Sequence, residues 1–271
     1  FNDEKIDIVV NFAAESHVYR SISEPTVFFK TNVIGVQTLL EVCKKYGVKR
    51  FHQISTDEVY GELPLDRKDL LFTEKTILSA SSPYSASKAS ADLLVLSYFK
   101  TFGLSVTVSR CSNNYGPYQF PEKLIPLVIL RAMKDEQIPI YSKGENVRDW
   151  IFVKDHCIAV DSIIRYGTSG EIYNIGANNE MSNLEIVNLI LEQLKKPKSL
   201  ISFVKDRPGH DLRYAVNSSK IEHELGWCAE TDFLTGLRKT VEWYIENEKW
   251  INSIITEDYI NYFDKMYSEK F

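Results

Sequence analysis

Short apolar runs alternate with longer amphipathic stretches over the first 110 residues of the chain. The runs at 6–12, 50–55 and 104–110 are predicted to be buried strands. Two stretches with helical spacing of apolar residues lie between them, at about 25–46 and 82–102. The order strand, helix, strand, helix, strand predicts a parallel sheet with right-handed crossover connections.

Local signals define the ends of both helices. Gly47 follows the first helix as a C-terminal cap, and Ser82 with Pro83 supplies the N-cap and first position of the second. Beyond Cys111, prolines interrupt the pattern, which indicates a second lobe built from interleaved segments. The further predicted elements are helices at 123–134, from about 153, at 183–194 and at 234–248, and strands at 149–153 and 171–175.

Composition is that of a globular protein, with 271 residues, 44% of them hydrophobic and 25% charged. No run of about 18 apolar residues is present, so no membrane span is expected. The net charge of -5 and the lack of a basic stripe argue against nucleic-acid binding. Four dispersed cysteines predict reduced thiols without a metal site, and a cytoplasmic location.

Tyr84 and Lys88 lie four positions apart, hence on one face of the second helix. An ammonium beside a phenol favours the phenolate, so we predict that Lys88 lowers the pKa of Tyr84 from about 10 towards neutrality. Tyr84 would then remove a proton from an alcohol while a hydride leaves the same carbon. The spacing alone occurs on many helices, and its position between two parallel strands favours the functional interpretation.

Asp57 and Glu58 follow directly after the predicted strand at 50–55. Neighbouring residues on a regular strand point to opposite faces, so both can serve one site only if the chain leaves the strand here. The alternative is an N-cap aspartate beside a solvated glutamate. Ligands bind at the carboxyl ends of parallel strands. We therefore expect Asp57 and Glu58 to act as two acid–base groups in addition to Tyr84 and Lys88. Two additional groups indicate a reaction step other than oxidation of the alcohol.

A set of polar residues is scattered through the second lobe. Guanidinium and imidazole groups suit a diphosphate, although each of these residues could equally be a surface charge. The set comprises Asn113, Lys123, Arg148, Arg207 and His210. After the first strand, the small residues of the segment 11–17 would let a flat ligand approach the backbone.

These motifs resemble, in their order, those of the extended short-chain dehydrogenase/reductase family, and within it the dehydratases that act on dTDP-glucose. The similarity covers residues 6–248. It rests on the motifs at 13–17, 31–33, 55–61, 84–88, 110–117, 121–126, 146–150 and 206–211. It implies an α/β fold with a Rossmann-like parallel sheet and a smaller α/β substrate-binding lobe. The dinucleotide-binding part would be 1–110 with about 150–176, and the substrate lobe about 111–149 with 177–271.

The resemblance also implies a lyase reaction that uses NAD. Tyr84, assisted by Lys88 and Thr56, would take the proton of the sugar's 4-hydroxyl while NAD accepts the C4 hydride. Glu58 and Asp57 would then eliminate water across C5 and C6, and the hydride would return to C6. Implied cofactor-binding residues are Phe12, Ala13, Ala14, Glu15, Ser16, Thr31, Tyr84, Lys88 and Asn114. Implied substrate-binding residues are Ser16, His17, Thr56, Asn113, Lys123, Leu124, Pro139, Tyr141, Arg148, Asn183, Arg207 and His210.

The chain departs from the family pattern at two places. Tyr19 stands where relatives carry an aspartate. The glycine-rich strand–turn–helix unit that precedes the first strand in the family does not appear in this sequence, so we expect a fragment, or a sequence whose front was not recorded. A protein that truly starts at Phe1 is expected to bind NAD weakly or not at all, and to show no turnover.

Three further implications remain open. The resemblance implies a homodimer through the helices at 25–46 and 84–102. One alternative function is a nucleotide-sugar epimerase or decarboxylase, although such enzymes lack an Asp-Glu pair after the threonine. The other is a non-catalytic protein that binds a nucleotide sugar through Lys123, Arg148 and Arg207.

Overall fold

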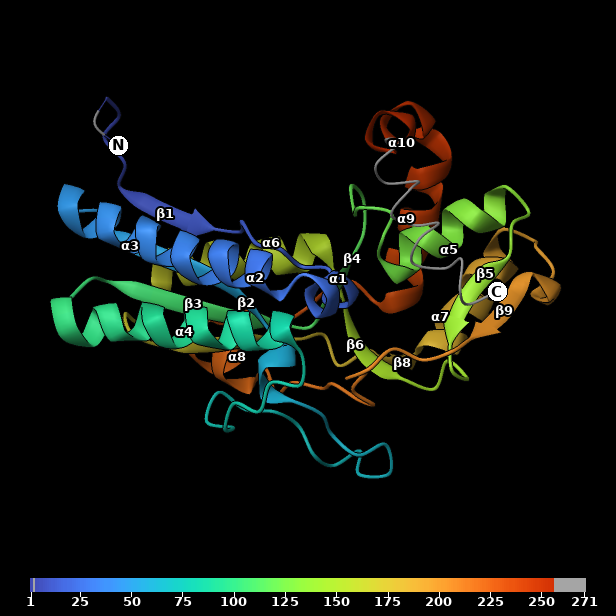
Figure 1. The fold of residues 1–271 in the computed structure, drawn as a ribbon, viewed down its shortest axis with the longest axis horizontal. Helices are drawn as coiled ribbons and strands as arrows, with labels where there is room; N and C mark the ends of the chain where they lie inside the picture. The colour runs from blue at the N-terminus through green and yellow to red at the C-terminus, as the bar shows by residue number, and fades with distance from the viewer. Residues whose placement is uncertain (2, 256–271) are drawn as a thin grey trace.

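The computed structural model, which describes residues 1 and 3–255, has a four-stranded sheet at its centre. Its strands, in sheet order, are β1 (Ile8–Asn11), β2 (Arg50–Thr56), β3 (Val106–Cys111) and β7 (Ile172–Ile175). All three pairings are parallel, as predicted. Because the strands are parallel, their carboxyl ends meet at one edge, which faces the second lobe (Figure 1).

Helices cover both faces of this sheet. One face carries α2 (Pro25–Phe29), the π-helical turn η1 (Lys30–Ile34), α3 (Gly35–Tyr46) and α4 (Pro83–Phe102). On this face Leu40, Phe51 and Val95 are fully buried in one core. The other face carries α6 (Val153–Tyr166) and α8 (Ser219–Leu225), around a second core that includes Ile163 and Ile175.

The predicted helix at 25–46 is interrupted by η1. A π-helical turn holds one residue more than an α-turn and is frequent at functional sites. Within it Asn32 is buried, and its amide group donates to Glu15 O (3.0 Å) and Ser87 Oγ (2.9 Å). Its Oδ1 accepts from the backbone N–H of Glu15 at 2.8 Å. Asn32 therefore fastens the segment after β1 to α4.

The predicted start of α4 is confirmed. Ser82 is the N-cap, with its hydroxyl accepting from Ser85 N–H at 3.1 Å in a reciprocal capping box, and Pro83 follows as the first helical residue. The helix ends at Gly103, a left-handed cap. Since Tyr84 is the second residue of α4, the N-cap at Ser82 also fixes the position of the Tyr84 backbone.

The second lobe has its own core, formed by helices packed against two small sheets. Its helices are α5 (Leu124–Met133), α7 (Asn183–Gln193), α9 (Phe233–Glu246), α10 (Glu248–Ile254) and the 3-10 turn η3 (Lys198–Leu200). One sheet orders β4 (Asn113–Tyr115), β6 (Val147–Phe152) and β8 (Glu180–Ser182); the other pairs β5 (Ile138–Tyr141) with β9 (Ile201–Val204). The helices at 123–134, 183–194 and 234–248 were predicted within two residues at each end; β4, β5, β8 and β9 were not. None of the helices in residues 1 and 3–255 is long and apolar enough to span a bilayer.

Candidate active site

The chain turns sharply where β2 ends. Thr56 is still extended, and a 3-10 turn, η2 (Asp57–Tyr60), follows at once. The Thr56 hydroxyl accepts from Glu58 N–H and donates to Asp57 Oδ1, both at 3.2 Å. The turn ends at Gly61, whose φ of +88° and approach to Ser79 O exclude a side chain. The chain therefore leaves the strand as predicted, and both carboxyl groups can face one site.

Asp57 is buried and Glu58 is half-buried at the cavity wall, so their surroundings differ. Burial raises the pKa of Asp57 well above its usual value, and the charge of Glu58 adds to this shift. Burial also raises the pKa of Glu58, but three cations oppose it: Arg207, Arg148 and Lys123. These surroundings favour a protonated Asp57 and an ionised Glu58. One carboxyl group can then donate a proton and its neighbour can accept one.

Tyr84 and Lys88 lie on the buried side of α4, close to this pair. Burial and the charge of Glu58 raise the pKa of Tyr84 well above 10, while a hydrogen bond from Thr56 opposes the rise. The Lys88 ammonium donates to Ile54 O at 2.6 Å, and burial lowers its pKa. The prediction that Lys88 lowers the pKa of Tyr84 is thus wrong for the chain by itself, because desolvation and negative charge dominate.

The predicted cofactor residues lie on several segments. Phe12, Ala13 and Ser16 follow β1 and Thr31 lies in η1, and all four are exposed. On β4, Asn114 Oδ1 is buried without a hydrogen-bond partner among the described residues. A buried acceptor left unpaired is costly unless a ligand satisfies it. Such an acceptor fits a ligand that carries a hydrogen-bond donor, such as the amide group of a nicotinamide.

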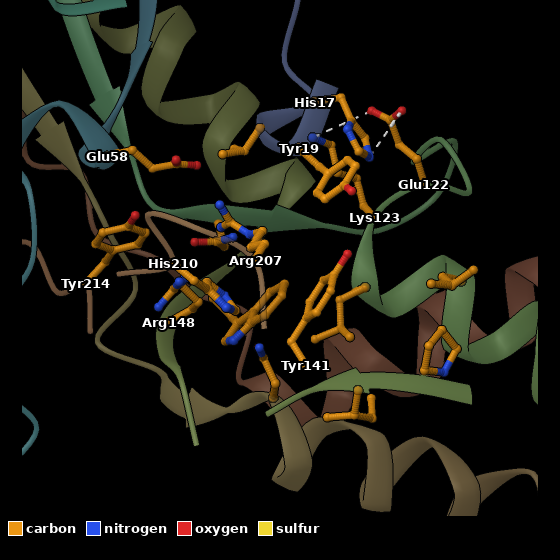
Figure 2. Close-up of a pocket in the computed structure, with 18 of the residues that line it drawn as sticks. His17, Tyr19, Glu58, Glu122, Lys123, Tyr141, Arg148, Arg207, His210 and Tyr214 are labelled. Atoms are coloured by element: carbon orange, nitrogen blue, oxygen red, sulfur yellow. Dashed lines mark ion pairs between the residues drawn. The ribbon is translucent and has the colours of Figure 1, made fainter. Parts of the chain in front are cut away.

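A cavity of about 1080 Å³, counting solvent at its mouth, lies between the two lobes (Figure 2). Among its walls are the predicted residues His17, Glu58, Asn113, Lys123, Leu124, Pro139, Tyr141, Arg148, Asn183, Arg207 and His210. Ser16, Thr56, Asp57, Tyr84 and Lys88 do not line it.

Several lining residues were not predicted. They are Val18, Tyr19, Gln119, Glu122, Leu127, Ile140, Trp150 and Tyr214. Glu122 lies inside the motif 121–126 but was given no role, and Tyr214 follows the motif 206–211 by three residues, so a longer motif would have included it. Tyr19 was noted only as a departure from the family pattern, yet it lies beside His17 in the cavity (Figure 2).

Positive charge gathers in the cavity. The Arg148 guanidinium lies 4.1 Å from the centroid of the Tyr214 ring and donates to Asp211 O at 2.8 Å. Lys123 Nζ donates to Ser16 O at 2.8 Å and so joins the cavity to the segment after β1. With Arg207, these side chains suit a diphosphate group.

His17 also lines the cavity, next to these cations. Its Nδ1 accepts from Arg20 N–H at 3.1 Å. Burial, helped by Lys123 and Arg207, lowers the pKa of His17 to about 3. The imidazole is therefore neutral near pH 7 and can bind a ligand by hydrogen bonding without adding a charge.

Comparison with known proteins gives a consistent result. Residues 1–240 match the family model described as GDP-mannose 4,6-dehydratase. The dTDP-glucose 4,6-dehydratase of Escherichia coli is 47% identical over 98% of this chain and 80% of its own length. The crystal structure of the dTDP-glucose 4,6-dehydratase DesIV from Streptomyces venezuelae, which has NAD bound, is 45% identical over 93% of this chain and 77% of its own, with a TM-score of 0.90. The structure of a Bacillus anthracis dTDP-glucose 4,6-dehydratase in complex with NAD is 49% identical over 93% of this chain and 77% of its own, with a TM-score of 0.85.

Proposed function

Because the chain belongs to the GDP-mannose 4,6-dehydratase family, we propose that it dehydrates dTDP-glucose to the 4-keto-6-deoxy sugar with NAD as cofactor. The observation that carries the proposal is the turn η2. It supports the proposal because two carboxyl groups with opposed surroundings lie close to Tyr84, and one of them, Glu58, lines the cavity. An epimerase oxidises and re-reduces C4 alone and needs no such pair.

The cavity would hold the nucleotide sugar. We assign the diphosphate to Arg148, Arg207 and Lys123, which supply its positive wall. Glu58 faces the same cavity, so the sugar would extend from the diphosphate towards η2 (Figure 2).

Tyr84 begins the reaction by taking the proton of the 4-hydroxyl. NAD, when bound, supplies the hydride acceptor for C4, the hydride donor for C6 and a positive charge that favours the Tyr84 phenolate. The cofactor would be held by Phe12, Ala13, Ala14, Glu15, Ser16, Thr31, Tyr84, Lys88 and Asn114. Lys88 holds α4 against β2 and so keeps the phenol in position.

Elimination then falls to the two carboxyl groups. The 4-keto group acidifies C5, and Glu58 takes the C5 proton. Asp57 donates its proton to the 6-oxygen as the C6–O bond breaks and water leaves. The proton on Glu58 exchanges with solvent, and once C6 has been reduced, Glu58 protonates C5. The proton that Tyr84 removed replaces the one that Asp57 gave, so the net change is the loss of one water.

Turnover in deuterated water tests this function. Incubation of the protein with NAD and dTDP-glucose should give a product that absorbs in alkali, as 4-keto-6-deoxy sugars do, with one deuterium at C5 from the solvent. An epimer that keeps its mass and lacks this absorbance would contradict the proposal.

We also propose a division of labour between the lobes. Residues 1–110 with about 150–176 would bind NAD, and about 111–149 with 177–271 the nucleotide sugar. The parallel sheet belongs to the first set, and α5, α7 and α9 to the second. Free thiols at all four cysteines support a reducing compartment, and we propose the cytoplasm.

A homodimer through the helices at 25–46 and 84–102 completes the proposal. α3 and α4 lie side by side on the outer face of the sheet (Figure 1). Large apolar side chains are exposed along these helices, among them Ile34 (58%), Leu93 (60%) and Phe102 (52%). Analytical ultracentrifugation should show a dimer that Leu93→Asp converts to a monomer; a wild-type monomer would contradict it.

A further inference from the structure

Asp211 occupies a junction between the two halves of the proposed active site. It ends the turn 206–211, and only 6% of its surface is exposed. Its Oδ2 accepts two hydrogen bonds, from Ser81 Oγ at 2.5 Å and from the Tyr214 hydroxyl. Ser81 comes from the segment that leads into α4, and Tyr214 lines the cavity.

The first bond reaches the helix that carries Tyr84. Ser81 directly precedes Ser82, the N-cap of α4, and Tyr84 lies in the first turn of that helix. The turn approaches this segment closely, because a Cβ on Gly209 would lie 3.0 Å from Ser81 O. Asp211 thus holds the start of α4 from the side of the substrate lobe.

The second bond reaches the cations of the cavity. The hydroxyl of Tyr214 is fixed by Asp211, and its ring lies under the Arg148 guanidinium at 4.1 Å. The backbone oxygen of Asp211 accepts from Arg148 Nη2 at 2.8 Å and from Asn146 Nδ2 at 3.1 Å. Figure 2 shows Tyr214 and Arg148 at the end of the cavity where Glu58 lies.

We propose that Asp211 is a positioning residue, which sets the diphosphate-binding Arg148 relative to the base Tyr84 through its bonds to Tyr214 and Ser81. This inference rests on the proposed function. Asp211 does not line the cavity and takes no part in proton transfer. Its effect is geometric, because a displacement of about 1 Å between binding groups and reacting groups can cost two orders of magnitude in rate.

Substitutions that cut one bond at a time test the proposal. Ser81→Ala cuts only the bond towards α4, so kcat for dTDP-glucose should fall about tenfold while the dissociation constant of dTDP, measured by calorimetry, stays unchanged. Tyr214→Phe keeps the ring under Arg148 but removes the hydroxyl that bonds to Asp211. The ring is then no longer fixed, so dTDP should bind several-fold more weakly. Asp211→Asn should show both effects, and adding Ser81→Ala to it should cause no further loss.

Asp155→Asn is the matched control. Asp155 is also a buried carboxylate, which accepts from Thr231 N–H at 3.0 Å on α6, away from the cavity. Its replacement should lower the melting temperature and leave kcat and dTDP binding unchanged. If Ser81→Ala and Tyr214→Phe match the wild type in both measurements, or if the loss in Asp211→Asn only follows its folded fraction, Asp211 is structural and the inference is wrong. A wild-type protein that neither binds dTDP nor turns over dTDP-glucose would instead overturn the proposed function, and the inference with it.

Discussion

The ammonium of Lys88 lies 2.6 Å from the carbonyl oxygen of Ile54, two residues before the end of β2. This bond joins the helix that carries Tyr84 to the strand that leads into Asp57 and Glu58. Lys88 is 4% exposed, so the bond is made in a dry environment, where a lost partner is expensive. The position of Tyr84 relative to Asp57 and Glu58 therefore depends on Lys88, which does not line the cavity.

Replacement of Lys88 should impair chemistry more than binding. Lys88→Met leaves Ile54 O unpaired and removes the positive charge near Tyr84, so kcat should fall about 100-fold or more, as for loss of an acid–base group. The dissociation constant of dTDP should not change. Steady-state kinetics and calorimetry would measure the two effects. Lys100→Met, in the exposed last turn of the same helix, is the control and should behave as wild type.

Replacement of Glu58 and replacement of Asp57 should block different steps of the reaction. Glu58→Gln removes the base, so C4 is still oxidised but the C5 hydrogen is not exchanged with solvent. Asp57→Asn retains C5 exchange but blocks departure of the 6-hydroxyl. Each should lower turnover by about 10²–10⁴-fold and accumulate reduced nicotinamide, visible by its absorbance. If neither variant accumulates reduced cofactor, the pair does not act after oxidation.

Arg207 should control the acid limb of the pH profile. Its charge lowers the pKa of Glu58, so Arg207→Met should raise that pKa. Because Glu58 must be ionised to act as a base, the midpoint of the acid limb of kcat should move to higher pH, measured with saturating dTDP-glucose. Arg165→Met removes an exposed arginine paired with Asp161 and should leave the midpoint in place. An unmoved limb in Arg207→Met would show that Glu58 is not the base.

His52 should make stability depend on pH. It is fully buried between Thr107 Oγ1 (2.8 Å) and Ser109 Oγ (3.1 Å), and burial lowers its pKa to about 3. The unfolded chain takes up a proton near pH 6.5, so this residue's contribution is complete above that pH. It is lost as pH falls towards 3, at about 1.4 kcal/mol per pH unit.

Urea denaturation at pH 7 and pH 5 would measure this contribution. His52→Gln should lose about 2 kcal/mol less than wild type between the two values. Buried carboxyl groups with raised pKa values act in the opposite direction, but they are common to both proteins and cancel in the difference. His223→Gln, at an exposed position, should lose as much as wild type. Equal losses in wild type and His52→Gln would contradict the assignment.

The sequence predicted those features that local chemistry determines. The cap at Ser82, the left-handed Gly47 and the sharp end of β2 each depend on a few neighbouring residues, and all three predictions are confirmed. β5 and β9 were missed, because each is four residues long and acquires its partner from about 60 residues away. The pKa of Tyr84 was predicted in the wrong direction for the chain alone, because a spacing reveals the nearby ammonium but not the depth of burial.

The roles assigned to individual site residues remain predictions. Eleven of them line one cavity, whereas Tyr84 and Lys88 do not. The motifs could not reveal this difference, because one motif can hold side chains that face a cavity and side chains that do not. Trp150 lies inside the motif 146–150 and Ile140 outside every motif, and neither was singled out, because apolar wall residues carry no chemical signature in a sequence.

The cavity takes its wall from segments as far apart as His17 and Tyr214. A ribosome must therefore complete more than three quarters of this chain before the pocket can exist. Until Tyr214 has been made, the wall beside Arg148 is incomplete. Because the pocket needs both lobes in place, we expect it to be among the first features that mild denaturant removes.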